Sequence, residues 1–350
     1  MKSFHSTREE ELKQWLIGCG EKPFRASQIL DWVYKKGILD WNQMSNLGAP
    51  LKQKLAEHFQ LNSLKLVKTE ESTDGETTKF LWELVDGKLV ESVLIRSFDR
   101  RTVCVSSQVG CPARCAFCAS GKKGLIRNLS SAEIFEQVFE IDRFLKEKGE
   151  RVCHVVYMGM GEPFENYEAV ISSIKLLCDP NRLGLSQRRV TVSTVGVVEG
   201  ITRFAEEEMK VNLVLSLHAP NQKLRMKIIP YARKYGLDEI LSAMRCFAEK
   251  TKRDITYEYT LMSGINDGLD QAEELAALLA GQQCTVNLIP YNPVSGLRLE
   301  RPVKEKIEAF RELLDARGLN VTWRYTKGKD IAAACGQLAL IESSSQREEN

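Results

Sequence analysis

Three cysteines in one short loop are the residues of this sequence best suited to chemistry. Cys111, Cys115 and Cys118 lie in the segment VGCPARCAFCASG with the spacing C-x3-C-x2-C, directly after a predicted strand. A structural zinc site normally has four ligands, often with a second C-x2-C pair, and the sequence contains no such second pair. Three thiolates instead suit a 4Fe-4S cluster that keeps one iron open to a ligand. The spacing therefore favours a catalytic iron–sulfur cluster over structural zinc.

A glycine-rich loop, MGMGEP, is the second candidate binding feature. It contains Gly159, Gly161, Glu162 and Pro163. Glycines let the backbone approach a ligand closely, and a carboxylate can bind an ammonium group. A tight connection between a strand and a helix has the same composition, so the loop alone is weak support for a site.

Other polar residues follow the predicted strands at their ends. They are Ser193, Ser216, His218, Asn266 and Asn292. Each has an ordinary explanation, because such residues cap helices and form turns. In parallel β/α architectures, however, ligands bind at the carboxyl ends of the strands. Their shared position is therefore what indicates a site.

The elements that must position these residues alternate regularly from residue 102 onward. Helices such as Ser131–Lys146 and Val303–Arg317 are predicted between strands, and a seventh strand, Asn320–Tyr325, precedes the segment GKDIAAACGQL. The six strands before it are Thr102–Ser106, Val152–Met158, Arg189–Ser193, Val211–Leu217, Ile255–Leu261 and Cys284–Ile289. This alternation predicts an α/β fold with a parallel sheet, either an incomplete (β/α) barrel or a doubly wound sheet.

The rest of the chain has a different character. Residues 1–62 are predicted to form a small helical accessory domain that contacts RNA, with helices in WLIGCG, in FRASQILDWVYKKG and near residues 49–59. Residues 63–100 alternate in hydrophobicity between DG turns, so we expect a small antiparallel β segment that bridges the two domains. The core should span 101–340, and the polar residues 341–350 should be a disordered tail.

Composition limits the classes of function. The apolar runs are too short to cross a membrane, and ten thinly spread cysteines suit a reducing compartment, so we expect a cytoplasmic protein without a membrane segment. A net charge of +2 excludes a general polyanion binder, so nucleic-acid contact must come from local basic patches or not at all. The candidate patches, each of which could equally be a solvated face, are Lys122, Lys123 and Arg127; Arg182, Arg188 and Arg189; and Lys223, Arg225, Lys227, Arg233 and Lys234.

Taken together, the motifs resemble those of a known family over nearly the whole chain. FRASQILDWVY, CVSSQVGCPARCAFC, GMGEP, VTVSTVG, LSLHAP, LIPYNP and ACGQL are similar to the dual-specificity RNA adenine methyltransferases of the radical S-adenosylmethionine (SAM) superfamily. The resemblance implies an incomplete (β/α)6 radical SAM barrel, a 4Fe-4S cluster, two SAM molecules per turnover, and methylation of carbon 2 of an adenine in 23S rRNA and tRNA. It also implies a one-electron donor such as flavodoxin, and we expect a monomer.

The same resemblance implies roles for individual residues. Cys335 would carry the methyl group, Cys104 would resolve the intermediate by forming a disulfide with it, and Glu91 in LVESVLI would accept a proton. Composition alone would treat the two cysteines as small buried hydrophobes and Glu91 as an outward-facing carboxylate. The cluster ligands would be Cys111, Cys115 and Cys118, and the SAM contacts would be Gly161, Glu162, Ser193, Ser216, Leu217, His218 and Asn292.

Two departures and three rivals stand beside this hypothesis. Arg96 occupies a position where the family usually has proline, and VVEG follows VSTVG where VVP is commoner, which bears on the surroundings of Glu91 and Ser193. The rivals are an enzyme that methylates carbon 8 of the same adenine, a non-catalytic zinc-binding or RNA-binding module, and a radical SAM enzyme that acts on a small molecule. The long helical N-terminal region favours carbon 2 over carbon 8.

Overall fold

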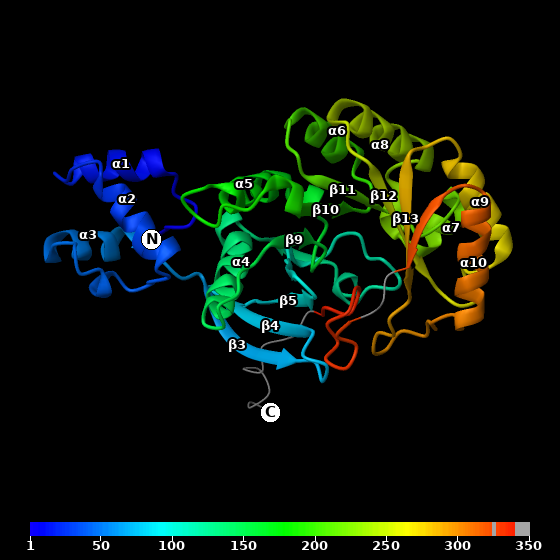
Figure 1. The fold of residues 1–350 in the computed structure, drawn as a ribbon, viewed down its shortest axis with the longest axis horizontal. Helices are drawn as coiled ribbons and strands as arrows, with labels where there is room; N and C mark the ends of the chain where they lie inside the picture. The colour runs from blue at the N-terminus through cyan, green and yellow to red at the C-terminus, as the bar shows by residue number, and fades with distance from the viewer. Residues whose placement is uncertain (324–326, 340–350) are drawn as a thin grey trace.

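A ten-stranded mixed sheet organises most of the chain in the computed structural model, which describes residues 1–323 and 327–339 (Figure 1). The strand order is β14-β13-β12-β11-β10-β9-β6-β5-β4-β3. The strands are β3 (Leu64–Glu71), β4 (Thr77–Leu84), β5 (Leu89–Ser97), β6 (Arg100–Cys104), β9 (His154–Tyr157), β10 (Val190–Thr194), β11 (Asn212–Ser216), β12 (Ile255–Leu261), β13 (Cys284–Pro290) and β14 (Asn320–Trp323).

Seven strands of this sheet, β6, β9, β10, β11, β12, β13 and β14, are parallel to one another. Their order follows the sequence without the reversal that a doubly wound sheet requires, so the barrel alternative is confirmed. β14 is the last strand of the sheet and is not paired with β6, which leaves the barrel incomplete. The helices that connect the strands are α4 (Ser131–Lys146), α5 (Tyr167–Cys178), α6 (Val198–Glu206), α7 (Gln222–Ile228), α8 (Leu237–Thr251), α9 (Leu269–Leu279) and α10 (Lys304–Ala316).

The helix α4 shows how local sequence sets these elements. Ser130 accepts a hydrogen bond from the backbone N–H of Glu133, and the Glu133 side chain accepts one from the N–H of Ser130, which completes a capping box. The apolar side of the helix, which includes Ile134, Phe135 and Val138, is buried against the sheet. The helix therefore begins and ends where the sequence predicts.

The predicted antiparallel segment extends the main sheet and does not form a sheet of its own. β3, β4 and β5 pair as antiparallel hairpins, and β5 then pairs with β6, with Val93 opposite Cys104. The antiparallel character of the segment agrees with the prediction, whereas the pairing of β5 with the first barrel strand is a long-range choice that hydrophobic alternation does not reveal.

The N-terminal part is helical, as expected. It contains α1 (Glu9–Gly18), α2 (Arg25–Leu30), which continues as a π-helical turn, and α3 (Ala49–His58), and a short parallel pair of β1 (Lys2–Ser3) with β2 (Phe59–Gln60). Arg182, in the loop after α5, joins this part to the core. Its guanidinium donates to the carbonyl oxygens of His5 and Thr7 and to the hydroxyl of Tyr34, each at 2.6 Å.

The segment Lys327–Ala339 crosses from β14 to the antiparallel strands, where Figure 1 draws it in red below the barrel. Lys327 donates from Nζ to the carbonyl oxygen of Arg96 at 2.8 Å, and Ala339 donates from its backbone N–H to Oε2 of Glu91 at 2.8 Å. The predicted strand end at Tyr325 and the predicted tail 341–350 lie outside the described residues. Among the described helices, none is both long enough and apolar enough to span a membrane.

Candidate active site

The three-cysteine loop lies between β7 (Gln108–Gly110) and β8 (Leu125–Asn128), which pair as a small antiparallel ribbon. Backbone hydrogen bonds fix its path. The N–H of Cys111 donates to the carbonyl oxygen of Gly124 at 3.1 Å, and that of Cys118 donates to Cys115 at 3.1 Å. The N–H of Ala116 donates at 2.8 Å to Ile228, at the end of α7. The loop is therefore anchored both to its own ribbon and to the barrel.

All three thiols line one cavity, which we call the smaller cavity. Burial raises the pKa of Cys111 to about 12 and also raises the pKa of Cys115 and Cys118. Within the described residues, which include all ten cysteines, none forms a disulfide. In that same part of the chain, no three His, Cys, Asp or Glu side chains are arranged to hold a single metal ion.

These features fit an iron–sulfur cluster. Three soft ligands around one cavity, with other cavity walls supplied by backbone and polar side chains, suit a cluster that presents one iron to a further ligand. Cys111, Cys115 and Cys118 are the residues that would hold it.

The glycine-rich loop packs so closely against the chain after β6 that there is no room for a Cβ atom at two of its glycines. A Cβ on Gly159 would lie 2.6 Å from the carbonyl oxygen of Val105, and one on Gly161 would lie 2.6 Å from Oγ of Ser107. Gly161 also has a φ of 112°, a left-handed conformation that favours glycine. Both glycines line the smaller cavity, so the close packing of this loop against the chain after β6 also shapes the cavity wall.

Glu162 is buried and joins the ends of two strands. Its Oε1 accepts hydrogen bonds from the hydroxyl of Thr194 at 2.7 Å and from the N–H of Phe164 at 3.0 Å, and its Oε2 accepts from the N–H of Val195 at 2.8 Å. Burial raises its pKa to about 7 despite these bonds. The carboxylate lines the smaller cavity, where it could receive an ammonium group.

Three more predicted residues complete the same wall. The hydroxyls of Ser193 and Ser216 lie 3.2 Å apart, at the ends of β10 and β11. His218 accepts a hydrogen bond at Nδ1 from the N–H of Thr260 at 2.9 Å, so its proton is on Nε2. Burial, followed by the charge of Arg225, lowers the pKa of His218 to about 3, so the ring is neutral and can donate from Nε2.

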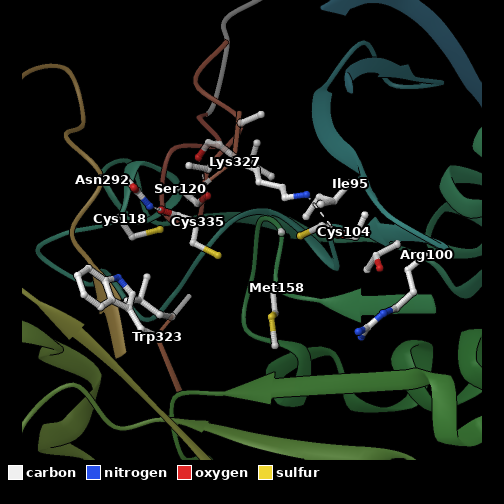
Figure 2. A pocket seen from close by; sticks show the side chains of 18 residues that line it. Ile95, Arg100, Cys104, Cys118, Ser120, Met158, Asn292, Trp323, Lys327 and Cys335 are labelled. Atoms are coloured by element: carbon white, nitrogen blue, oxygen red, sulfur yellow. Dashed lines mark hydrogen bonds between the residues drawn. The ribbon is translucent and has the colours of Figure 1, made fainter. Parts of the chain in front are cut away.

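Cys335 and Asn292 lie where the smaller cavity meets a second one of about 560 Å³, which we call the larger cavity. Cys118 also belongs to both linings, whereas Cys104 lines only the larger one. Figure 2 shows the sulfur atoms of Cys335 and Cys104 both turned toward the interior of the larger cavity, with Met158 below them. The structure therefore brings together two cysteines from opposite ends of the core, beside the three-cysteine loop.

Glu91 lies on the cavity side of β5 but lines neither cavity. It is 2% exposed, and its carboxylate contacts Lys79 and the N–H of Ala339. Leu338, the neighbour of Ala339, does line the larger cavity. The end of the Lys327–Ala339 segment therefore contacts Glu91 and also contributes to the wall of the larger cavity.

Two residues that the sequence placed at the site, Leu217 and Asn266, are buried and line neither cavity. Leu217 is buried outside both cavity linings, with its N–H donated to the carbonyl oxygen of Glu258 at 3.0 Å. Asn266 is fully buried, donates from Nδ2 to the carbonyl oxygens of His218 and Thr260, and accepts from the N–H of Met262. Asn266 therefore shapes the loop that contains His218 and does not line the site.

Sequence reasoning missed two charged residues close to the site. Glu258 lines the smaller cavity, and its charge within the apolar run ITYEYTL was the available signal. Arg225 is fully buried and donates to the carbonyl oxygens of Leu217, Val195 and Ser216 at 3.2, 2.5 and 3.2 Å. No pattern in the sequence separates Arg225 from its solvated neighbours.

Two of the candidate basic residues are buried, and a third is ion-paired. Arg182 is 5% exposed and Arg225 is 0% exposed, so their guanidinium groups serve the interior of the protein. Arg127 is committed to Asp86 and Glu133 in two ion pairs.

Family models match both parts of this architecture. Residues 5–61 match the N-terminal domain of ribosomal RNA large subunit methyltransferases, and residues 105–279 match the radical SAM superfamily. A relative from Protochlamydia amoebophila, the probable dual-specificity RNA methyltransferase RlmN 2, is 63% identical over 96% of this chain and 94% of its own length. The chain belongs to the RlmN family of radical SAM proteins.

Other members of the RlmN family extend the match. The probable dual-specificity RNA methyltransferase RlmN of Lysinibacillus sphaericus is 47% identical over 98% of this chain and 90% of its own length. The crystal structure of a radical SAM methyltransferase from Sphaerobacter thermophilus superimposes with a TM-score of 0.94 at 43% identity, covering 97% of this chain and 99% of that one. Radical SAM membership implies a 4Fe-4S cluster and SAM as cofactors, in agreement with the donor set of the smaller cavity.

Proposed function

We propose that this protein methylates carbon 2 of an adenine in 23S rRNA and in tRNA, with Cys335 as the carrier of the methyl group. The observation that carries this proposal is the position of Cys335, which lines both the cavity of the three-cysteine loop and the cavity of Cys104. A methyl carrier must face the source of the group on one side and the acceptor on the other. Cys335 meets that requirement.

The cofactors supply the difficult chemistry when they are bound. The cluster and SAM together provide methyl groups and a radical route to a ring carbon that is not nucleophilic, with two SAM molecules consumed per turnover. Cys111, Cys115 and Cys118 would hold the cluster. Gly161, Glu162, Ser193, Ser216, His218 and Asn292 would contact SAM, and Leu217 would act only through the backbone of its loop.

The residues of the chain then divide the remaining work. Cys335 Sγ takes a methyl group, for which a thiolate is a good nucleophile. Glu91 accepts the proton from the ring carbon to which the new carbon–carbon bond has formed. Cys104 Sγ, as a thiolate, then attacks Cys335 Sγ. The carbon–sulfur bond breaks with its electron pair on the carbon, which takes up a proton to complete the methyl group, and a disulfide remains that an external thiol must reduce.

The larger cavity suits a nucleobase. Its volume of about 560 Å³ is in the range of pockets for small organic groups, and Met158 and Trp323 supply apolar walls. Its charged lining residues within the described chain are Arg100 and Lys327, both cationic, which favours a polyanionic substrate. The relatives are named as dual-specificity RNA methyltransferases, which supports RNA as that substrate.

Several finer features belong to the same proposal. We expect the protein to work in the cytoplasm, where RNA and reduced thiols are found, and to act as a monomer. The electron that starts the radical chemistry would come from a small one-electron donor such as flavodoxin. Residues 1–62 would contribute RNA contacts as an accessory domain.

Mass spectrometry of nucleosides tests this function. Purified, anaerobically reconstituted protein is incubated with SAM, a reductant and unmodified transcripts of 23S rRNA and tRNA, and the RNA is digested. We expect adenosine methylated at carbon 2. Methylation at carbon 8 would identify the sister reaction, and turnover on free nucleosides but not on RNA would identify a small-molecule enzyme. A colourless zinc-containing protein without SAM cleavage would support a non-catalytic module.

A further inference from the structure

A row of side chains crosses four strands at the antiparallel edge of the sheet and ends at Cys104. The register pairs Glu70 with Lys79, Lys79 with Val93, and Val93 with Cys104. Directly paired residues present their side chains on the same face of a sheet. Glu91 lies two residues before Val93 in β5, so it shares this face.

Lys79 lies between two carboxylates in this row. Its Nζ is 3.2 Å from Oε1 of Glu91 and 3.1 Å from Oε2 of Glu70. The side chain of Lys79 is 11% exposed, that of Glu91 is 2% exposed and that of Glu70 is 33% exposed. The three groups therefore form a chain of charges that leads from the interior to the surface.

The surroundings of Glu91 disfavour its ionised form unless nearby groups stabilise the negative charge. Burial raises the pKa of Glu91, and nearby Glu70 on β3 raises it further. Lys79 on β4 and the N–H of Ala339 in the C-terminal segment act in the opposite direction. A general base must be ionised before it can accept a proton, so these two groups favour the active form of Glu91.

We infer that Lys79 is a positioning residue that keeps Glu91 ionised for its proton transfer, while Glu70 holds Lys79 in place from the solvent side. This inference rests on the proposed role of Glu91. In the step itself, the carbon–hydrogen bond of the adenine ring breaks, its electron pair stays with the ring, and the proton becomes bound to a carboxylate oxygen of Glu91. Lys79 remains an ammonium group throughout.

The test measures the pH dependence of a single turnover. Holoenzyme methylated beforehand at Cys335 is mixed with SAM, reductant and an unmodified 23S rRNA transcript, and the release of methylated RNA is followed at pH values between about 5 and 9. In Lys79→Gln, we expect the acid limb of the profile to move up by about one to three pH units, because an opposite charge at this distance is worth that much. Lys79→Arg keeps the charge and should restore the limb.

Lys68 offers a matched control on the same surface. It contacts the other oxygen of Glu70, with its Nζ 2.9 Å from Oε1, and its side chain is 62% exposed. Lys68→Gln removes a lysine of the same network that is not in contact with Glu91, so its acid limb should coincide with that of the unmodified protein. An equal shift in Lys68→Gln and Lys79→Gln would overturn the inference, because it would reflect only net charge.

A second variant covers the possibility that Lys79→Gln does not fold. Glu70→Gln changes a partly exposed residue and removes the carboxylate that holds Lys79 beside Glu91. The acid limb should therefore move up, as in Lys79→Gln but by less, because Lys79 acts on the pKa of Glu91 more strongly than Glu70 does. An unchanged or downward limb in a folded Glu70→Gln protein would overturn the inference.

Glu91→Gln distinguishes failure of this inference from failure of the proposed function. All variants should still methylate Cys335, as measured by intact-protein mass, because that step precedes the proton transfer. If Glu91→Gln releases methylated RNA at the normal rate, Glu91 is not the proton acceptor and the proposed function needs revision. If Glu91→Gln stalls while Lys79→Gln keeps an unshifted acid limb, only the role of Lys79 is wrong.

Discussion

Asn292 donates a hydrogen bond from its side-chain Nδ2 to the backbone carbonyl oxygen of Cys335, across 3.2 Å. This bond connects the end of β13 to the segment that follows β14, and both residues line the two cavities. The position of the proposed methyl carrier is therefore set by a residue that would itself contact SAM.

Replacing Asn292 with alanine should remove both its hydrogen bond to Cys335 and its proposed contact with SAM. We expect methylation of Cys335 to slow by about tenfold or more, since one neutral hydrogen bond contributes roughly 1 kcal/mol and a SAM contact is lost as well. The rate is measured by intact-protein mass after mixing with SAM. Unchanged kinetics would show that the bond to Cys335 has no part in the reaction.

Cys335→Ala should separate SAM cleavage from RNA methylation. The variant keeps the three cluster cysteines, so it should still cleave SAM reductively, but it has no sulfur to receive the methyl group. Chromatography of the SAM products and nucleoside mass spectrometry measure the two activities side by side. Normal RNA methylation would remove Cys335 from the mechanism.

Cys104→Ala should stop the reaction one step later. Cys335 would still be methylated and would still attach to the RNA, but no thiol on β6 would be present to break the carbon–sulfur bond. We expect a covalent protein–RNA species on denaturing gels, which nuclease digestion reduces to a small mass increase on the protein. Absence of this species together with full turnover would assign the resolving role elsewhere.

Glu136 on α4 should make the stability of the apoprotein depend on pH. Burial raises its pKa to about 7 although its carboxylate accepts hydrogen bonds from the N–H groups of Ser63 and Leu64. Because the pKa is higher in the folded state than in the unfolded chain, the folded state gains stability when the group is protonated. This contribution is complete below about pH 4.5 and is lost as the pH rises through about 7.

Urea denaturation at pH 5 and pH 8 measures this effect. The free energy of unfolding of the unmodified protein should fall between pH 5 and pH 8 by up to a few kcal/mol, given roughly 1.4 kcal/mol per pKa unit. Glu136→Gln lacks the titrating group, so its free energy of unfolding should not show this part of the fall. An identical pH dependence in the two proteins would show that Glu136 does not titrate in this range.

Arg182→Met should loosen the junction between the N-terminal helices and the core. The substitution leaves the carbonyl oxygens of His5 and Thr7 and the hydroxyl of Tyr34 without their buried donor, at a cost of about 3 kcal/mol or more. Unfolding in urea and limited proteolysis near the junction report the change. A variant as stable as the original would show that water replaces the guanidinium.

The sequence allowed good predictions wherever local patterns decide the structure. The predicted bounds of α4 agree with the structure, and the alternation of strands and helices correctly indicated a parallel sheet. The pairing of β5 with β6 was not predictable, because alternation describes a strand without naming its partner. The family resemblance singled out Cys104 and Cys335, which line one cavity although composition gave no reason to join them.

Buried polar and charged side chains account for most of what sequence reasoning missed at the site. Arg225 lies in a basic run that resembles a solvated helix, yet its guanidinium binds three carbonyl groups in the interior. Asn266 follows a strand end like the cavity residues, but its side chain is used fully by neighbouring backbone groups. Whether such a side chain is buried or faces the cavity depends on how the loops pack against one another, and residue spacing in the sequence does not determine that packing.

The location of Cys335 in the Lys327–Ala339 segment has a consequence for synthesis of the protein. A ribosome synthesises the cluster loop and every described barrel strand before it reaches this cysteine. The same segment accepts hydrogen bonds from the loop, from Ala119 N–H at Gly336 and from the Ser120 hydroxyl at Leu338. A polypeptide interrupted just upstream should therefore lack the methyl carrier together with part of the support of the cluster loop.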